Sequence, residues 1–239
     1  MLAQLFQADA ELLHTHELAE LIISQPLLGT TVKTDGIESD PYAFLTVLNL
    51  RQHRGHVAIK ALIEYALAKS SDHAAFHQAL RALIGPTSSS HVGFIVSERL
   101  INMPVQVAPP MYKLLSDEIR WAIEENEPYQ FSHYLCISRT YHISEEDENA
   151  MEGVESSAPP AKRQKTPNKP HGLRTFSYHQ EDEIWEKFGS HVLDFKFTHE
   201  APRDAESIGV HTAGKLMLLP AEHFPLLVAE MQEKYAAPS

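Results

Sequence analysis

The chain has 239 residues, of which 43% are hydrophobic, so it is long enough to bury a substantial core without covalent cross-links. Its one cysteine, Cys136, excludes an internal disulfide and fits a reducing, intracellular compartment. The 32 acidic residues outnumber the 20 basic ones, and the formal charge of −12 disfavours nucleic acid and favours a basic partner. No apolar run approaches the roughly 18 residues of a membrane span, so no membrane partner is expected.

The first third of the chain predicts alternating helices and strands. The 3.6-residue spacing of apolar side chains predicts helices at residues 17–24, 56–69 and 72–84, with Thr15 and Asp72 as candidate caps. Strands are predicted at 30–33 and 42–50, the second of them buried. Pro26 and Gly85 end the helices that precede them.

The stretch of residues 91–112 predicts a strand, a polar turn and a helix. Residues 92–96 form a continuous apolar run, which is typical of a strand covered on both faces. The helix is predicted to begin at Pro110, where a missing N–H costs nothing. Between them lie polar and turn-forming residues: Ser97, Glu98, Arg99, Asn102 and Pro104.

These residues are interpreted as structural rather than catalytic. No G-x-S-x-G elbow surrounds Ser97, so a serine nucleophile is not indicated. We expect Glu98 and Arg99 to form ion pairs across neighbouring strands, because buried polar groups normally satisfy one another. Asn102 is expected to bond the backbone of the turn.

The second half predicts further strands at 131–143, 192–197 and 209–219, a helix at 181–188, and a last helix from Pro220. Residues 144–174 break this pattern, with an acidic first part, a basic second part and almost no large apolar residues. Such a segment cannot offset the entropy of ordering, so a disordered loop is predicted. We therefore expect one domain, formed by residues 1–143 and 175–239 and interrupted by the loop 144–174.

The block VGFIVSERLINMP, followed by APPMY, resembles the signature of the BCCIP family. Other pieces agree in order: QLF at 4–6, GTTVK at 29–33, Phe44 with LNL at 48–50, and FSHYLCISRTY at 131–141. The resemblance covers nearly the whole chain. It implies a nuclear protein that acts in ribosome assembly and protein export as a binding partner rather than an enzyme. The family pattern also places an acidic tail and a strand before the helix that ends at residues 5–6.

The turn before residue 57 resembles a second pattern, the acyl-coenzyme A motif Q/R-x-x-G-x-G/A of the GCN-five-related acetyltransferases (GNAT). There, small residues let backbone N–H groups at a helix start approach the pyrophosphate. Gln52 and Gly55 match, but Val57 places a β-branched side chain where the motif needs a small residue. We therefore expect a GNAT-like, three-layer α/β/α domain with a mixed sheet and a degenerate cofactor site, and no bound cofactor.

Two further candidate sites are interpreted as structural. His73 and His77 have the i, i+4 spacing of metal ligands, but neither a neighbouring Glu nor a third ligand is evident, so no metal is expected. Cys136 has no basic neighbour in sequence and is expected to be a thiol of the core.

Two functions remain. The BCCIP resemblance implies a non-enzymatic nuclear chaperone or adaptor for a basic ribosomal protein of the large subunit, universal protein fourteen, with a role in nuclear protein export. The alternative is an acyl-coenzyme A-dependent N-acetyltransferase that acts on a basic protein amine. Exposed carboxylates are the candidate contacts with the client: Asp117, Glu118, Glu124, Glu125, Glu181, Asp182 and Glu183.

The basic cluster Lys162, Arg163 and Lys165 follows two prolines and resembles a nuclear localisation signal. It predicts nuclear transport receptors as partners and a nuclear protein that shuttles to the cytoplasm. The alternative is that these bases only balance the acidic half of the same loop.

Overall fold

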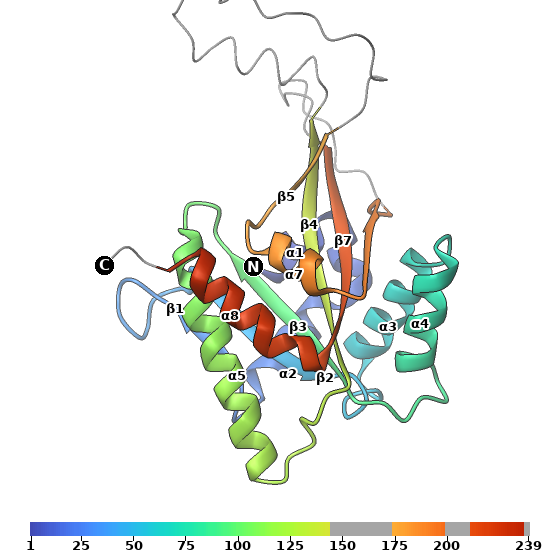
Figure 1. Ribbon diagram of the computed structural model, residues 1–239, viewed down its shortest axis with the longest axis horizontal. Helices are drawn as coiled ribbons and strands as arrows, with labels where there is room; N and C mark the ends of the chain where they lie inside the picture. Colours follow the sequence, from blue (N-terminus) through green and yellow to red (C-terminus); the bar gives the residue numbers. More distant parts are fainter. Residues whose placement is uncertain (144–173, 199–210, 237–239) are drawn as a thin grey trace, which may run out of the picture.

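The computed structural model describes residues 1–143, 174–198 and 211–236. Seven strands within these ranges form one mixed sheet in the order β1-β2-β3-β4-β7-β6, and β5 pairs with β4 (Figure 1). The strands are β1 (Thr30–Val32), β2 (Ala43–Asn49), β3 (Val92–Arg99), β4 (His133–Ile143), β5 (Arg174–Ser177), β6 (His191–Phe195) and β7 (His211–Pro220). Strands from both sides of residues 144–173 pair with one another, because β4 lies between β3 and β7.

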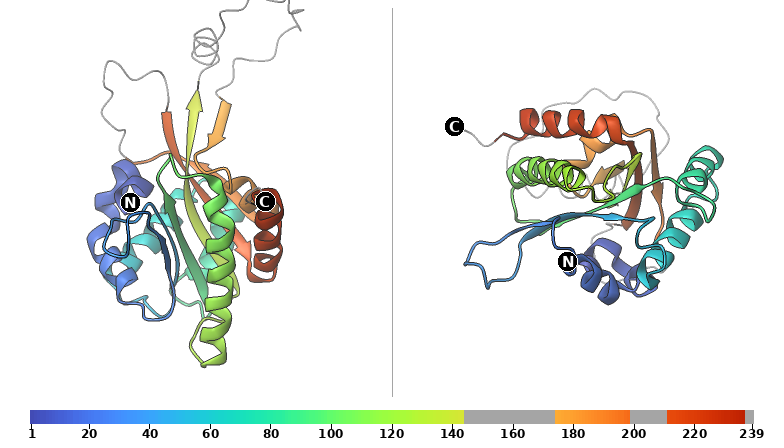
Figure 2. Two further views of the ribbon diagram at one scale, coloured as in Figure 1. Left: turned by 90° about the vertical axis from the view of Figure 1, so that its left-hand side faces the viewer. Right: turned by 90° about the horizontal axis from the view of Figure 1, so that it is seen from below.

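Helices cover both faces of the sheet (Figure 2). One face carries α1 (Leu2–Phe6), the 3₁₀ helix η1 (Gln7–Leu13), α2 (Thr15–Ile23), α3 (Val57–Lys69) and α4 (Ala74–Ile84). The other carries α5 (Ala108–Glu124), α7 (Asp182–Phe188) and α8 (Phe224–Lys234), with short 3₁₀ turns η2 (Val105–Val107) and η3 (Ala221–His223) before α5 and α8. The layers are therefore helix, sheet and helix. None of the described helices is both long and apolar enough to cross a membrane.

The central strands read as continuous apolar runs because each of their faces meets a separate core. In β4, Leu135 and Ile137 join the core under α3 and α4, whereas Tyr134 and Cys136 join the core under α5 and α8. The same alternation places Phe94 of β3 on the first side and Ile95 on the second. This is the period of two expected of a strand, with both faces buried.

Several predicted boundaries are wrong. Neither predicted cap is correct: α2 begins at Thr15 itself with His14 as its N-cap, and α4 begins at Ala74 with His73 as its N-cap. β3 continues through Arg99, because Ala43 of β2 pairs with that residue. α5 starts at Ala108, two residues before the predicted start. β5 occupies residues 174–177, at the edge of the region predicted as loop. The structure shows a mixed sheet of parallel and antiparallel strands with helices on both faces, whereas the resemblance to the GNAT fold stays a prediction.

Candidate functional site

The candidate site lies where the parallel strands β3 and β4 separate. Their backbone pairing runs from Val92 opposite His133 to Ile95 opposite Cys136 and then stops. Beyond it β3 continues along β2, and β4 continues along β7 and β5, so the two strands diverge (Figure 1). In open α/β sheets the carboxyl ends of such strands form the usual ligand crevice. Here polar side chains fill that space.

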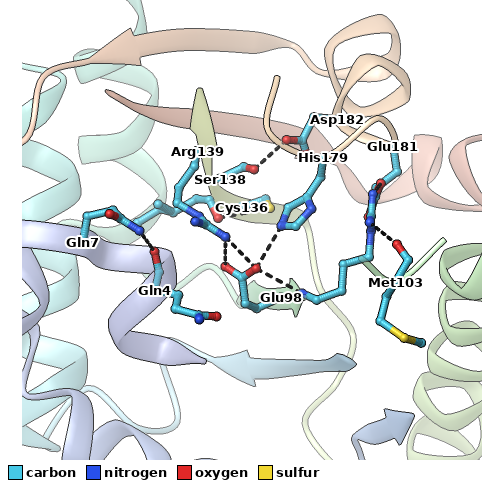
Figure 3. A network of polar contacts seen from close by, with 12 residues as sticks. Gln4, Gln7, Glu98, Met103, Cys136, Ser138, Arg139, His179, Glu181 and Asp182 are labelled. Atoms are coloured by element: carbon cyan, nitrogen blue, oxygen red, sulfur yellow. Dashed lines mark hydrogen bonds and ion pairs between the residues drawn. The ribbon is translucent and has the colours of Figure 1, made fainter. Parts of the chain in front are cut away.

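Glu98 is the centre of these polar contacts (Figure 3). Its carboxylate accepts bonds of 2.7 and 2.8 Å from the Arg139 guanidinium and lies 3.1 Å from Nε2 of His179. Arg139 also lies over the Tyr178 ring, 3.7 Å from its centroid. Glu98 is 1% exposed, so its charge is stabilised almost entirely by these partners. The predicted ion pair of Glu98 across neighbouring strands is confirmed, since Arg139 lies on β4.

Arg99 forms the second ion pair, but its partner does not lie on a strand. Its Nε and Nη2 each donate a 3.0 Å bond to Glu181, which lies just before α7. Its remaining Nη1 donates to the Met103 carbonyl at 2.7 Å and holds the turn after β3. Asn102 lies exposed in that turn, which is closed by a backbone bond from Met103 to Leu100. The two-pronged guanidinium geometry therefore joins the turn to the segment before α7.

Asp182 extends the network on its other side. Ser138 of β4 donates a 2.5 Å bond to its carboxylate, and the side chain is buried. Burial raises the pKa of Asp182 to about 7, because removal from water disfavours the charged form. The nearby Glu181 raises this pKa further, whereas His179 lowers it. We call the six ionisable residues that form these contacts the ion network: Glu98, Arg99, Arg139, His179, Glu181 and Asp182.

The ion network leaves little room. A hollow beside it, lined by Glu98, Arg99, Glu181 and the start of α5, has a volume of about 10 Å³. That is space for one water molecule at most. Three buried polar atoms at the network have no hydrogen-bond partner among the described residues: Nε of Arg139, Oγ1 of Thr140 and Nδ1 of His179. The network therefore acts as a buried connection between β3, β4 and α7.

The residues of the degenerate coenzyme A motif lie apart from this crevice. Gln52 and Gly55 occupy the turn after β2, and Val57 begins α3 with its side chain 45% exposed. A side chain added at Gly55 would meet nothing within 4 Å, so no cramped cradle surrounds this glycine. The helices α3 and α4 join β2 to its antiparallel neighbour β3. The parallel pair is instead joined by α5, which starts at a different turn.

The remaining candidate ligands and nucleophiles are engaged in the fold. Nδ1 of His77 lies 3.1 Å from the Leu67 carbonyl, and His73 is the N-cap of α4. No group of three or more potential metal ligands occurs among the described residues. Burial raises the pKa of the Cys136 thiol, which lies in the core as predicted. Ser97 is half-buried in β3 and Pro104 caps η2.

The seven candidate client-binding acids fall into four groups. Glu181 and Asp182 were expected on the surface, and this is wrong, since both are buried in the ion network. Asp117 and Glu183 are tied by ion pairs to Lys113 and Lys234.

Glu118 is half-buried and accepts a 3.1 Å bond from the Gly29 backbone. Burial raises the pKa of Glu118. Glu124 and Glu125 are exposed at the end of α5.

Two predictions fall outside the described residues: the basic cluster Lys162, Arg163 and Lys165, and the disordered loop predicted at 144–174, of which only residue 174 is described. Sequence reasoning did not identify Arg139, Tyr178 and His179 as members of the site. The signal available was a polar triplet, Ser138-Arg139-Thr140, in an otherwise apolar strand.

Comparisons with known proteins agree with this fold. The BCCIP family model matches residues 1–185. Protein bcp1 of Aspergillus oryzae is 42% identical over 240 residues, which cover 98% of this chain and 80% of the relative. Protein bcp1 of Schizosaccharomyces pombe is 41% identical over 243 residues, covering 99% and 84%. The crystal structure of BCP1 from Saccharomyces cerevisiae has a TM-score of 0.63 at 22% identity, covering 96% of this chain and 78% of that one.

The fold and the filled crevice define a mixed α/β protein whose parallel strands are joined by buried ion pairs. With the family model and these relatives, the chain belongs to the BCCIP family. The names of these relatives specify no enzymatic activity.

Proposed function

We propose that this protein is a non-enzymatic nuclear chaperone or adaptor on an acetyltransferase-like scaffold. Its proposed client is a basic ribosomal protein of the large subunit, universal protein fourteen, which it binds for ribosome assembly. The proposal includes a role in nuclear protein export.

The filled crevice is the observation that carries the proposal. At the carboxyl ends of β3 and β4, where an α/β enzyme commonly holds its ligand, the side chains of the ion network occupy the space, and the hollow beside the network has a volume of only about 10 Å³. Opening this space requires breaking buried charge pairs, and removal of one partner from such a pair costs several kcal/mol. A pocket for a nucleotide-sized cofactor at this place is therefore disfavoured. The lack of room at this place supports a function in binding through the surface.

The charge of the body supports a basic client. Only six of the 32 acids and five of the 20 bases lie in residues 144–174. The rest of the chain therefore carries a net charge of −11. A strongly basic ribosomal protein that is not yet assembled is attracted to such a body, and apolar contacts add specificity.

Mixing the purified protein with the client tests the proposal. An excess of the protein is expected to keep the client soluble and to reduce its binding to unrelated RNA. The association rate should fall steeply with salt, because electrostatic steering is screened over about 8 Å at physiological ionic strength. A client that precipitates equally with and without the protein would refute the chaperone function.

The acetyltransferase alternative has its own test. Calorimetric titration with coenzyme A and acetyl-coenzyme A is expected to show no binding to the unmodified protein, and micromolar binding would favour the enzyme. Val57→Gly removes the side chain that departs from the motif and is the matched variant for this titration.

Nuclear import through transport receptors is part of the proposal and is tested in cells. Replacement of Lys162, Arg163 and Lys165 by alanine should shift the protein to the cytoplasm. Unchanged nuclear accumulation would remove the assignment of this cluster as an import signal.

A further inference from the structure

The outer face of α5 carries two large apolar side chains beside its buried face. Leu114 and Trp121 are 37% and 51% exposed, and their spacing of seven residues places them on one side of the helix. Between them Glu118 contacts the backbone of Gly29, so this side of α5 runs along the chain that leads into β1. Half of a tryptophan side chain left in water on a rigid helix is a typical anchor for a partner.

The carboxyl end of α5 is fixed by its backbone. Asn126 has a φ of 65°, and its N–H bonds the Ile123 carbonyl at 3.0 Å. The N–H of Glu127 bonds the Ala122 carbonyl at 2.9 Å. Together these bonds form a Schellman motif, which asparagine tolerates because it can adopt the left-handed conformation. The side chains on this turn therefore extend from a defined position one turn beyond Trp121.

Three exposed carboxylates surround this end of the helix: Glu124, Glu125 and Glu127. The last turn of α5 contains no basic residue, and the ion pairs of the described residues do not engage these three acids. Farther up the helix, Asp117 is neutralised by both Lys113 and Arg120. Because a helix carboxyl end is itself partly negative, acids there repel it and attract an external cation.

We infer that the surface formed by Leu114, Trp121, Glu124, Glu125 and Glu127 binds an arginine-containing basic segment of a protein client. This inference rests on the proposed function and names the contact surface. A guanidinium stacks on an indole ring while its N–H groups bind carboxylates, a combination that lysine reproduces less well. A nucleic acid would be repelled by the three acids. An isologous contact with a second copy through this surface would bring the three acids of each copy into one interface, where like charges disfavour binding.

Tryptophan fluorescence reports directly on this surface. The chain contains two tryptophans, and Trp185 is fully buried with its indole N–H bonded to Tyr112. Acrylamide quenching of the free protein therefore comes mainly from Trp121. The probes are an arginine–glycine repeat peptide and its citrulline counterpart, which has a similar shape without charge. The arginine peptide should protect Trp121 from quenching, and the citrulline peptide should not.

Variants separate this surface from general charge attraction. Trp121→Ala should weaken binding of the arginine peptide and of the ribosomal client about ten- to thirtyfold, as for an aromatic anchor. Changing Glu124, Glu125 and Glu127 together to Gln should weaken binding and flatten its salt dependence. The control changes three exposed acids elsewhere to Gln, with the same loss of charge: Glu11, Glu64 and Glu233.

The possible results are distinct. If the control set weakens binding as much as the α5 set, or if the Trp121 variant binds normally, the surface is assigned wrongly while the chaperone function stands. Dimerisation through Trp121, seen by sedimentation, would also overturn the assignment. If the unmodified protein does not keep the ribosomal client soluble, the proposed function itself is refuted, whatever the result with the peptides. An unchanged near-ultraviolet spectrum of the triple Gln variants shows that they are folded.

Discussion

Replacement of Glu98 by glutamine tests whether the ion network holds the fold together. The change keeps the shape of the side chain but removes its charge and replaces one acceptor oxygen with a donor NH₂. Four donor contacts converge on this carboxylate: two from the Arg139 guanidinium, one from the backbone N–H of Arg99 and one from Nε2 of His179 if that nitrogen carries the proton. In the variant, the buried charge of Arg139 loses its counter-ion and two donors face each other.

The expected loss of stability follows from burial. The side chains of Glu98 and Arg139 are 0% and 5% exposed, so water cannot replace the lost partner. Breaking one side of such a buried pair costs roughly 3–5 kcal/mol. For a protein of this size, that corresponds to a fall of roughly 6–20 °C in the melting temperature. Urea unfolding followed by circular dichroism measures the change in unfolding free energy.

The matched control makes the same chemical change on the surface. Glu183 lies 2.7 Å from Lys234, but its side chain is 62% exposed, so Glu183→Gln should scarcely move the unfolding midpoint. A double variant, Glu98→Leu with Arg139→Met, should recover part of the stability lost in Glu98→Gln, because it leaves no unpaired charge. Equal midpoints for Glu98→Gln and Glu183→Gln would refute the view that the network holds β3 to β4.

Three further predictions concern single buried groups. The pKa of Asp182 in the folded protein is about 7, above its ordinary value, so the folded protein binds this proton more tightly than the unfolded chain does. The unfolding free energy should therefore fall as pH rises from about 4 to 7. Asp182→Asn should lessen that fall in urea titrations. A dependence unchanged by the variant would contradict this. Gly214→Ala places a methyl group into the Phe195 ring and should cost about 1–3 kcal/mol; adding Phe195→Leu should relieve the clash in thermal unfolding. Cys136 should react with a thiol reagent much faster in urea than in the native protein, because it is buried and its pKa is raised; rapid native labelling would show otherwise.

Local patterns in the sequence were sufficient for most helices and strands. The apolar run at 92–96 and the alternating run at 192–197 correspond to β3 and β6, and the periodic stretch at 56–69 corresponds to α3. These predictions succeed because the spacing of apolar residues that identifies a helix or a strand can be seen within a short stretch of the sequence. Boundaries set by capping or by a partner strand were less accurate, as the start of α4 and the extension of β3 show.

The candidate site was predictable only in part. The sequence indicated that Glu98 and Arg99 are buried ion-pair residues, but not that Arg139, His179 and Glu181 are their partners. Those partners lie 41 to 82 positions away along the chain, and no local pattern records which of them meet. The same limit explains why Glu181 and Asp182 were expected on the surface.

The sequence by itself determined the family signature, the acidic balance and the elements that pack on both faces of the sheet, because these depend on composition and short-range spacing. The tertiary structure alone decided which acids are neutralised. It buries Glu181 and Asp182 beside Arg99 and Ser138, and it leaves the acids at the end of α5 in water beside Trp121. Whether a carboxylate is a structural group or a binding group depends on the charges and the water around it, and only the folded chain brings these together.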